Sequence, residues 1–341
     1  MKHALGVVAI GLSLTTGLVV CSGRVSAEGD NAIFAQLPDA PEGIAVDSNG
    51  TMYVTTINGQ QIFQVNDDGS SILIATVPSA EEVGQGLLIG METDADDNII
   101  VAYTQHSAIN GGDDLFNPRH PACHDVRVTR TGVYKVEPTT GAVTAIATRG
   151  DGHPFCFPDD VDIDKSGNIY LTDLTYAGIW KISADGSSVT MWSDHALLNW
   201  TDDALPLGVN VLVLDKAEEN IFAATTTLEG LIVRIPINED GSAGEAVIHS
   251  RGHTFFDGIE IDDDGYIYVS EPGINTILAV SPEAGWLGMT ARKTLSSGGD
   301  LQGPTSLVLR DGVLYTTNLA FGVPPENQNK AVVAIRNFVR D

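Results

Sequence analysis

The chain has 341 residues, and its 45 acidic side chains against 18 basic ones give a formal net charge of −27 at pH 7. A surface of this charge repels nucleic-acid phosphates and anionic lipid headgroups, so the composition excludes nucleic acid as a partner. The 43% hydrophobic content and the 36 glycines exclude a disordered acidic tail and predict a folded, turn-rich protein.

The first 27 residues have the pattern of an export signal. A charged start over residues 1–3 precedes an apolar stretch over residues 4–20, and the segment ends in Val25-Ser26-Ala27. This pattern is typical of a signal peptide removed after Ala27. A membrane anchor, the alternative, is less suited because a span needs about 20 apolar residues. We therefore predict export to the periplasm or the extracellular space and a mature domain over residues 28–341 without a membrane span.

The mature chain would keep two cysteines, Cys123 and Cys156. An exported protein meets oxidising conditions, in which a disulfide between the two is the simplest prediction. A catalytic or metal-binding thiol is the alternative, but no Cys-x-x-Cys spacing supports it.

An internal repeat sets the architecture. The segment over residues 41–55 recurs over residues 159–172 and 257–270, each time with a polar, glycine-containing turn followed by a tyrosine. Weaker copies lie between and after them, and successive anchor residues stand 47, 70, 52, 46 and 47 positions apart. Five such intervals imply six units. The anchors are Tyr53, Ile100, Tyr170, Phe222, Tyr268 and Tyr315.

Each unit predicts four short strands. Apolar and polar residues alternate on both sides of the turn, which is typical of a hairpin with one buried face. A second hairpin follows, with expected strands over residues 61–65 and 71–76 in the first unit and over residues 178–182 in the third. Short strands at this spacing, without helical periodicity, predict an all-β fold: one six-bladed β-propeller domain with four antiparallel strands per blade.

Two further segments bear on the ring of blades. Residues 31–36 have no partner in their own unit, and the last unit ends with an apolar run over residues 330–335. We expect the N-terminal segment to supply the outer strand of the last blade, which closes the ring and removes an exposed edge. The 70-residue interval holds an insertion at about residues 104–131 that is typical of a long loop and contains Cys123. Long loops on a rigid scaffold tend to be functional.

Equivalent positions of the repeat form a ring of oxygen-bearing side chains. The innermost strands line the channel of a propeller, so side chains at one register converge around its axis. Converging carboxylates raise the free energy unless a proton or a cation joins them. The six positions, each five residues before the turn Asp47 or its equivalent, are Glu42, Ile89, Asp159, Asn210, Asp257 and Pro304.

The four polar members of this ring are the predicted metal ligands: Glu42, Asp159, Asn210 and Asp257. A flexible set of Glu, Asp and Asn oxygens suits calcium better than magnesium, and zinc would recruit histidine or cysteine. The alternative is a wet rim, because strand entries are often polar and need touch only solvent.

Several other residues are weaker candidates. Residues 162–173 and 260–271 resemble the spacing of a calcium-binding loop, but both lie in the repeated hairpin, whose turn needs Asp and Gly for its own geometry. We assign them to that turn. Histidines in or beside the insertion and before the third repeat could supply a general base, although lone histidines are usually surface residues. The candidates for a pocket or proton-shuttle group are His106, His120, His124, His153 and Asp160.

Four motifs resemble a known family: Pro41-Glu42-Gly43, Pro158-Asp159-Asp160, Gly208-Val209-Asn210 and Phe256-Asp257-Gly258. They are similar to the regucalcin (senescence marker protein), gluconolactonase and luciferin-regenerating-enzyme superfamily, and the likeness covers the mature chain. The resemblance implies that a Glu, two Asn and an Asp from different blades hold a divalent cation. By register, these are Glu42, Asp159, Asn210 and Asp257. Asp159 stands where many family enzymes have Asn, and Val211 where a Gly usually follows the fourth-blade Asn.

The resemblance further implies a metal-dependent hydrolase of lactones or related esters, in which the cation, most suitably calcium, polarises the substrate carbonyl. Asp257 is then the candidate catalytic residue for activating water or attacking directly. Two alternatives stay open: a non-catalytic propeller that binds a ligand or protein around a structural calcium, and a strictosidine-synthase-like lyase or synthase. We expect a small-molecule substrate or ligand and, by default, a monomer.

Overall fold

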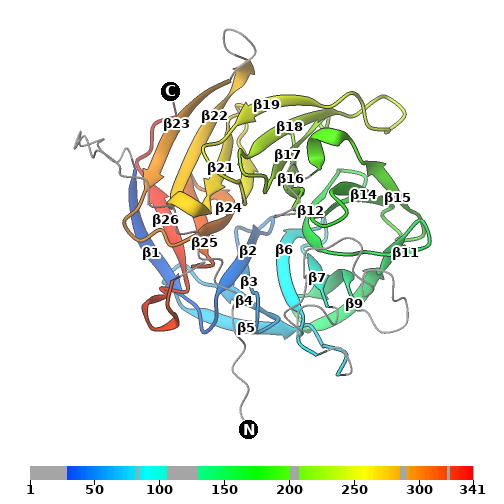
Figure 1. Cartoon of the computed structure of the whole chain (residues 1–341). Coiled ribbons are helices and arrows are strands. Elements are labelled where there is room, and N and C mark those ends of the chain that lie inside the picture. The colour runs from blue at the N-terminus through cyan, green and yellow to red at the C-terminus, as the bar shows by residue number, and fades with distance from the viewer. Residues whose placement is uncertain are drawn as a thin grey trace.

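The computed structural model describes residues 29–81, 84–105, 130–199, 207–284, 290–320 and 323–340. They form six four-stranded antiparallel sheets, arranged as the blades of a propeller around a central channel (Figure 1). The predicted all-β, six-bladed fold is therefore confirmed. No helix within these ranges is both long and apolar enough to cross a membrane.

In the first three blades the chain runs from the channel outward, one strand after another. The strands predicted over residues 61–65, 71–76 and 178–182 have those bounds in the structure. The strands are β2 (Pro41–Val46), β3 (Met52–Thr56), β4 (Gln61–Val65) and β5 (Ser71–Thr76); β6 (Leu87–Thr93), β7 (Ile99–Thr104), β8 (Gly132–Glu137) and β9 (Ala142–Ala147); and β12 (Pro158–Ile163), β13 (Ile169–Asp173), β14 (Gly178–Ile182) and β15 (Val189–Ser193).

The next two blades repeat this order, and the last blade is shared between both ends of the chain. A short hairpin of β10 (Arg149–Gly150) and β11 (His153–Pro154) precedes the third blade. The remaining strands are β16 (Val209–Leu214), β17 (Asn220–Thr225), β18 (Leu231–Pro236) and β19 (Val247–Arg251); β20 (Ile259–Ile261), β21 (Ile267–Glu271), β22 (Thr276–Ala284) and β23 (Thr290–Ser297); and β24 (Pro304–Arg310), β25 (Val313–Asn318), β26 (Ala331–Arg336) and β1 (Asp30–Gln36).

β1 closes the ring. It pairs antiparallel with β26, from Asp30 opposite Arg336 to Gln36 opposite Ala331. The two strands lie side by side in Figure 1 although they come from opposite ends of the chain. The expected closure by the N-terminal segment is confirmed, and it leaves β26 without an open edge.

A side-chain bonded turn explains the repeated hairpin between the first and second strands. In the first blade, Oδ1 of Asp47 accepts the backbone N–H groups of Asn49 (2.9 Å) and Thr51 (2.8 Å). Asp164 and Asp262 repeat this arrangement in the third and fifth blades. The segments that resemble calcium loops are therefore hairpin turns, as predicted, because these carboxylates are already engaged by their own backbone.

The apolar core is divided among the boundaries between blades. Between the first two blades, Tyr53 and Ile62 pack in one cluster with Leu88 and Tyr103. Comparable clusters occupy the other five boundaries. Because each blade is fixed by dense packing on both sides, equivalent residues of the inner strands are held at one height around the channel.

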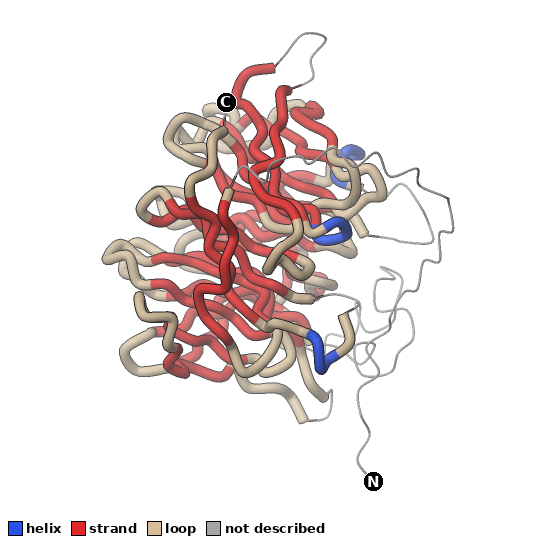
Figure 2. The backbone as a smooth tube through the Cα atoms, turned by 90° about the vertical axis from the view of Figure 1, so that its left-hand side faces the viewer, coloured by secondary structure: helices blue, strands red, loops and turns tan. Residues whose placement is uncertain are grey.

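The two faces of the disc differ. The short 3₁₀ turns η2 (Ala196–Leu198), η3 (Pro272–Ile274) and η5 (Pro325–Asn327) lie on one face, and tight hairpin turns crowd the other (Figure 2). η2 lies in the connection that leads into an inner strand, so the inner strands begin on this first face. We call it the entry face.

Candidate functional site

Inner strands carry a β-bulge where they begin at the entry face. In the first blade the pairing with the second strand shifts by one residue between Pro41 and Ile44, and in the third blade between Pro158 and Val161. The same irregularity occurs in the second, fourth and sixth blades. Bulges re-aim side chains and are frequent next to active sites. In these five blades the bulged segments contain the predicted ring positions.

The structure brings the four predicted ligands together. Glu42, Asp159, Asn210 and Asp257 come from four different blades, and their exposed fractions are only 4%, 6%, 6% and 7%. Nδ2 of Asn210 donates to Oδ1 of Asp257 over 3.4 Å. The charges of Asp257 and Asp159 act directly on Glu42. These side chains therefore form one buried polar group, which we call the ring.

One predicted ring position is wrong by one residue. Pro304 pairs with Asn318 as Pro41 pairs with Thr56, so the sixth-blade equivalent of Glu42 is Thr305, not Pro304. The cause is the length of the hairpin, because 15 positions separate Pro41 from Thr56 but only 14 separate Pro304 from Asn318. Counting back through this turn shifts the alignment. Thr305 is fully buried.

A threonine of the second strand fixes neighbouring ring positions to each other. Oγ1 of Thr55 accepts from the Gly43 N–H and donates to the Ile89 carbonyl, both over 2.7 Å. Equivalent threonines bond to the carbonyl groups of other ring residues in two further blades. Sequence reasoning missed this role, although the repeated Tyr-x-Thr motif was visible. The equivalent threonines are Thr172 and Thr317.

The carboxyl groups of the ring resist ionisation. Burial, followed by the negative charges of neighbouring carboxylates, raises the pKa of Glu42 and of Asp159 well above the ordinary values, with Asp257 the strongest neighbour of each. Burial also raises the pKa of Asp257, to about 7, against the hydrogen bond from Asn210, which lowers it. The three acids therefore carry less than their full charge at neutral pH unless a cation joins them.

Two ring oxygens lack a hydrogen-bond partner. Oε2 of Glu42 and Oδ1 of Asn210 are buried and accept no hydrogen bond. Leaving a buried acceptor unpaired costs about 1–3 kcal/mol, so such atoms usually mark a place for a ligand or ion. Within the described ranges, however, no three acidic, histidine or cysteine side chains stand close enough to enclose an ion as they are. The carboxylate and amide oxygens of the ring are ligands that a hard cation prefers. The side chains would have to rotate to enclose such an ion.

Further acids line the channel beside the ring. Burial raises the pKa of Glu92 and of Asp160 to about 8, that of Glu260 to about 7 and that of Asp162 to about 6. All four border a cavity of about 50 Å³. This volume has room for a few water molecules.

Three of these channel acids accept backbone N–H groups of the next inner strand. Asp160 accepts from Leu212 (3.1 Å), Asp162 from Leu214 (2.6 Å) and Glu260 from Leu309 (3.2 Å). An inner strand is the edge of its sheet, so its N–H groups on the channel side have no neighbouring strand and need other acceptors. Asp160, a predicted pocket residue, thus lies at the channel and links the third blade to the fourth.

A family model described as the SMP-30/Gluconolactonase/LRE-like region matches residues 121–291, which is half of the chain. The chain belongs to this family. A second model, for the N-terminal part of strictosidine synthase-like proteins, matches residues 35–62. Strictosidine synthase-like 3 of Arabidopsis thaliana is 45% identical over 42 residues, which cover 12% of this chain and only 11% of the plant protein.

Solved structures of the SMP-30/gluconolactonase type share the fold. A gluconolactonase from Xanthomonas campestris has a TM-score of 0.63 at 12% identity, covering 90% of this chain and 89% of its own. The calcium-binding protein regucalcin from Agrobacterium tumefaciens has a TM-score of 0.62 at 13% identity, covering 92% and 95%. At such identities the likeness establishes the fold alone.

Among the remaining predicted residues of this SMP-30/gluconolactonase-like chain, those that the structure describes do not join the ring. His153 is exposed on the β10–β11 hairpin. His106, His120, His124 and Cys123 lie outside the described residues, as does nearly all of the insertion. The disulfide to Cys156, itself fully buried, therefore stays a prediction.

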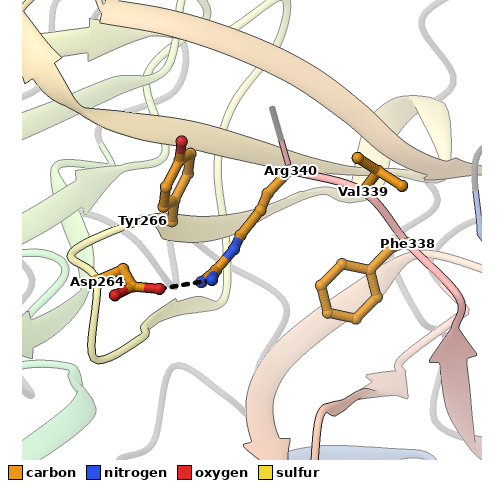
Figure 3. Close-up of a pocket in the computed structure, with 5 residues that line it drawn as sticks. All are labelled: Asp264, Tyr266, Phe338, Val339 and Arg340. Carbon is orange, nitrogen blue, oxygen red and sulfur yellow. Dashed lines mark hydrogen bonds and ion pairs between the residues drawn. The ribbon is translucent and has the colours of Figure 1, made fainter.

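A larger hollow of about 420 Å³ lies elsewhere on the molecule. Asp264, Tyr266, Phe338, Val339 and Arg340 line it, and Arg340 reaches across to Asp264 (Figure 3). Asp264 belongs to the turn between β20 and β21, on the face opposite the entry face. The hollow shares no residue with the ring. Buried acids converge on the smaller channel cavity, so we take that cavity as the one beside the candidate site.

Proposed function

We propose that the protein is a calcium-dependent hydrolase of lactones or related esters. The observation that carries the proposal is the ring of Glu42, Asp159, Asn210 and Asp257, in which two buried oxygens have no partner and three acids have raised pKa values. A divalent cation would satisfy those oxygens and offset the repulsion between the acids. Membership of the SMP-30/gluconolactonase/LRE-like family supports the reaction class.

Calcium is the proposed ion because every donor in the ring is a carboxylate or amide oxygen. Calcium accepts such ligands in flexible geometry, whereas magnesium demands a near-ideal octahedron. The likeness to a protein described as calcium-binding regucalcin points the same way. Glu42, Asp159, Asn210 and Asp257 would hold the ion, and it would polarise the substrate carbonyl.

Asp257 is the proposed base. Its pKa, about 7, is less perturbed than those of Glu42 and Asp159, which lie well above ordinary values, so it is the ring acid most ready to accept a proton from water near neutral pH. One O–H bond of the water breaks, the proton moves to the Asp257 carboxylate, and the water oxygen bonds to the carbonyl carbon while the C=O π pair moves onto the carbonyl oxygen. That pair re-forms the C=O bond as the C–O bond of the lactone breaks, and the departing alkoxide needs a proton. Ile89 and Thr305 add no charge on their sides of the ring.

The test combines metal analysis with turnover. We expect purified protein to contain one calcium per chain and to hydrolyse a lactone or an aryl ester. Chelation should abolish turnover and calcium should restore it. Asp257→Asn should lower kcat at least about 100-fold, the usual contribution of a general base. Absence of bound calcium after dialysis against it would overturn the proposal.

A non-catalytic calcium-binding protein is the second candidate, favoured by the regucalcin-like fold match. Bound calcium without turnover on any lactone or aryl ester would select it. Export, removal of residues 1–27 and the pairing of Cys123 with Cys156 belong to the proposal as well. N-terminal sequencing and thiol counting of protein recovered from its native host test these three points.

A further inference from the structure

A histidine and a buried glutamate form a pair on the entry face. Glu271 ends β21 and its side chain is completely buried, whereas that of His253 is 54% exposed. Oε1 of Glu271 accepts the backbone N–H groups of His253 (2.6 Å) and Thr254 (3.1 Å), and Oε2 lies 3.1 Å from Nδ1 of His253. An ionised carboxylate can only accept hydrogen bonds, so the contact with Oε2 assigns the proton of the imidazole to Nδ1. Nε2 is left for an outside partner.

This pair is tied to the ring through β21. The Asp257 N–H donates to the carbonyl of Ser270 over 3.2 Å, and Ser270 is the chain neighbour of Glu271. Consecutive Cα atoms are about 3.8 Å apart, so two adjacent residues of one strand hold both ends of the loop from His253 to Asp257. The histidine is thereby placed on the connection that delivers the proposed base to the ring.

Holding this loop by its backbone N–H groups does not in itself require a histidine. In the third blade, Asp173 holds the equivalent connection by accepting the N–H groups of Cys156 (2.7 Å) and Phe157 (2.9 Å). Among the described residues, no imidazole bonds to Asp173. The fifth blade therefore adds a half-exposed imidazole whose Nδ1 is held by the same carboxylate, which is how proton-transferring histidines are commonly built.

We propose that His253 is the general acid of the site, protonating the alkoxide that leaves when a lactone ring opens. This role rests on the proposed hydrolase function. As the C–O bond of the lactone breaks, its electron pair stays on the leaving oxygen. The Nε2–H proton of the imidazolium moves to that oxygen, and neutral imidazole remains. Solvent then returns a proton to Nε2. Glu271 is a positioning residue, since it touches no reacting atom and acts through the imidazole and through the loop backbone that it holds.

The experiment compares two leaving groups. An aliphatic lactone releases a basic alkoxide that needs a proton, whereas a nitrophenyl ester releases a phenolate that leaves without one. With calcium present, we expect His253→Gln to lower kcat/KM for the lactone about 100-fold, within the usual range for general acids, and for the nitrophenyl ester by less than about threefold. Glu271→Gln should show the same selectivity to a lesser degree. A merely structural role would lower both rates equally.

The matched control is His195→Asn. His195 also faces a carboxylate, Glu245 at 3.7 Å, but that carboxylate is 87% exposed. Asparagine can replace His195 as the N-terminal cap of η2. Both rates should stay unchanged in this variant, and thermal unfolding shows whether each variant folds. Equal losses, or none, in His253→Gln would overturn the inference while leaving the hydrolase standing. A wild-type protein that hydrolyses neither substrate would overturn the hydrolase and this role with it.

Discussion

At the scale of single residues, Asp159 gives the ring a third carboxylate besides Glu42 and Asp257. An additional negative ligand binds a cation more tightly and, by donating more charge, leaves it a weaker Lewis acid. We therefore expect Asp159→Asn to weaken calcium binding about tenfold and to raise kcat at saturating calcium. Calorimetric titration and lactone turnover measure the two effects.

Asp311→Asn is the control for that substitution. Asp311 lies exposed in the turn between β24 and β25 with a φ of 52°, a conformation that asparagine adopts readily. Calcium affinity should not change in this variant. An unchanged affinity in Asp159→Asn as well would remove Asp159 from the set of ligands.

The channel acids make the stability of the metal-free protein depend on pH. Burial raises the pKa of Glu92 from its ordinary 4.5 to about 8. The folded protein therefore keeps a proton on Glu92 at pH values where the unfolded chain has lost it. The free energy of unfolding falls as pH rises through this window. We expect the Tm of chelated protein to fall by several degrees between about pH 5 and about pH 8.

Glu92→Gln should reduce that fall, because the amide does not titrate. Glu239→Gln, at an exposed position, should leave it unchanged. A Tm that rises over the same pH interval in all three proteins would contradict the assignment of protonated acids to the channel.

The sequence predicted the ring in five blades and missed it in the sixth. Glu42, Asp159, Asn210 and Asp257 follow from alignment because each lies five residues before the aspartate of its turn. Thr305 did not, because the length of the turn after β24 is visible only in the pairing of Arg310 with Val313. The pair of His253 and Glu271 was equally hidden, since 18 positions separate its members.

At the scale of elements, the close approach of neighbouring inner strands depends on glycines. A Cβ on Gly258 would overlap the backbone carbonyl oxygen of Thr305, closer than two such atoms can come. Gly258→Ala must therefore displace one of the two strands beside Asp257. We expect it to cost about 1–3 kcal/mol of stability and to weaken calcium binding together with turnover. Chemical denaturation and calcium titration provide the readouts.

Gly50→Ala separates crowding from backbone strain. Gly50 has a φ of 81°, and no atom lies within 4 Å of the point that an added methyl group would occupy, so alanine there strains the turn without touching the ring. It should lower stability by about 1 kcal/mol and leave calcium affinity intact. Loss of affinity in both variants would mean that the ring responds to global stability alone.

Hairpins could be predicted in the sequence, and bulges could not. Alternating residues around a polar turn define β4, β5 and β14 to the residue, because burial of one face imposes a period of two. A bulge inserts one residue without altering that composition. It depends on which second-strand threonine, such as Thr55, bonds to which carbonyl, and such bonds join separate blades.

At the scale of the whole molecule, ring closure by β1 should decide whether the propeller resists aggregation. A chain that starts at Leu37 lacks β1 and leaves β26 as an open edge, and it loses Ala35 from the packing between the last and first blades. We expect this truncation to lower the Tm and to aggregate. A chain that starts at Gly29 keeps β1 and is the control. Size-exclusion chromatography and thermal unfolding compare the two chains. If the chain that lacks β1 stayed monomeric with an unchanged Tm, the closing role of β1 would be contradicted.

The pairing of β1 with β26 also has a kinetic consequence. Asp30 and Arg336 lie at opposite ends of the described chain, so their contact has the longest sequence separation of any strand pair here. Contacts of this kind slow folding, because the intervening chain must be ordered before they form. During synthesis the last blade must wait for its final strand. The nascent chain therefore remains an open, unclosed arc until nearly all of it has emerged from the ribosome.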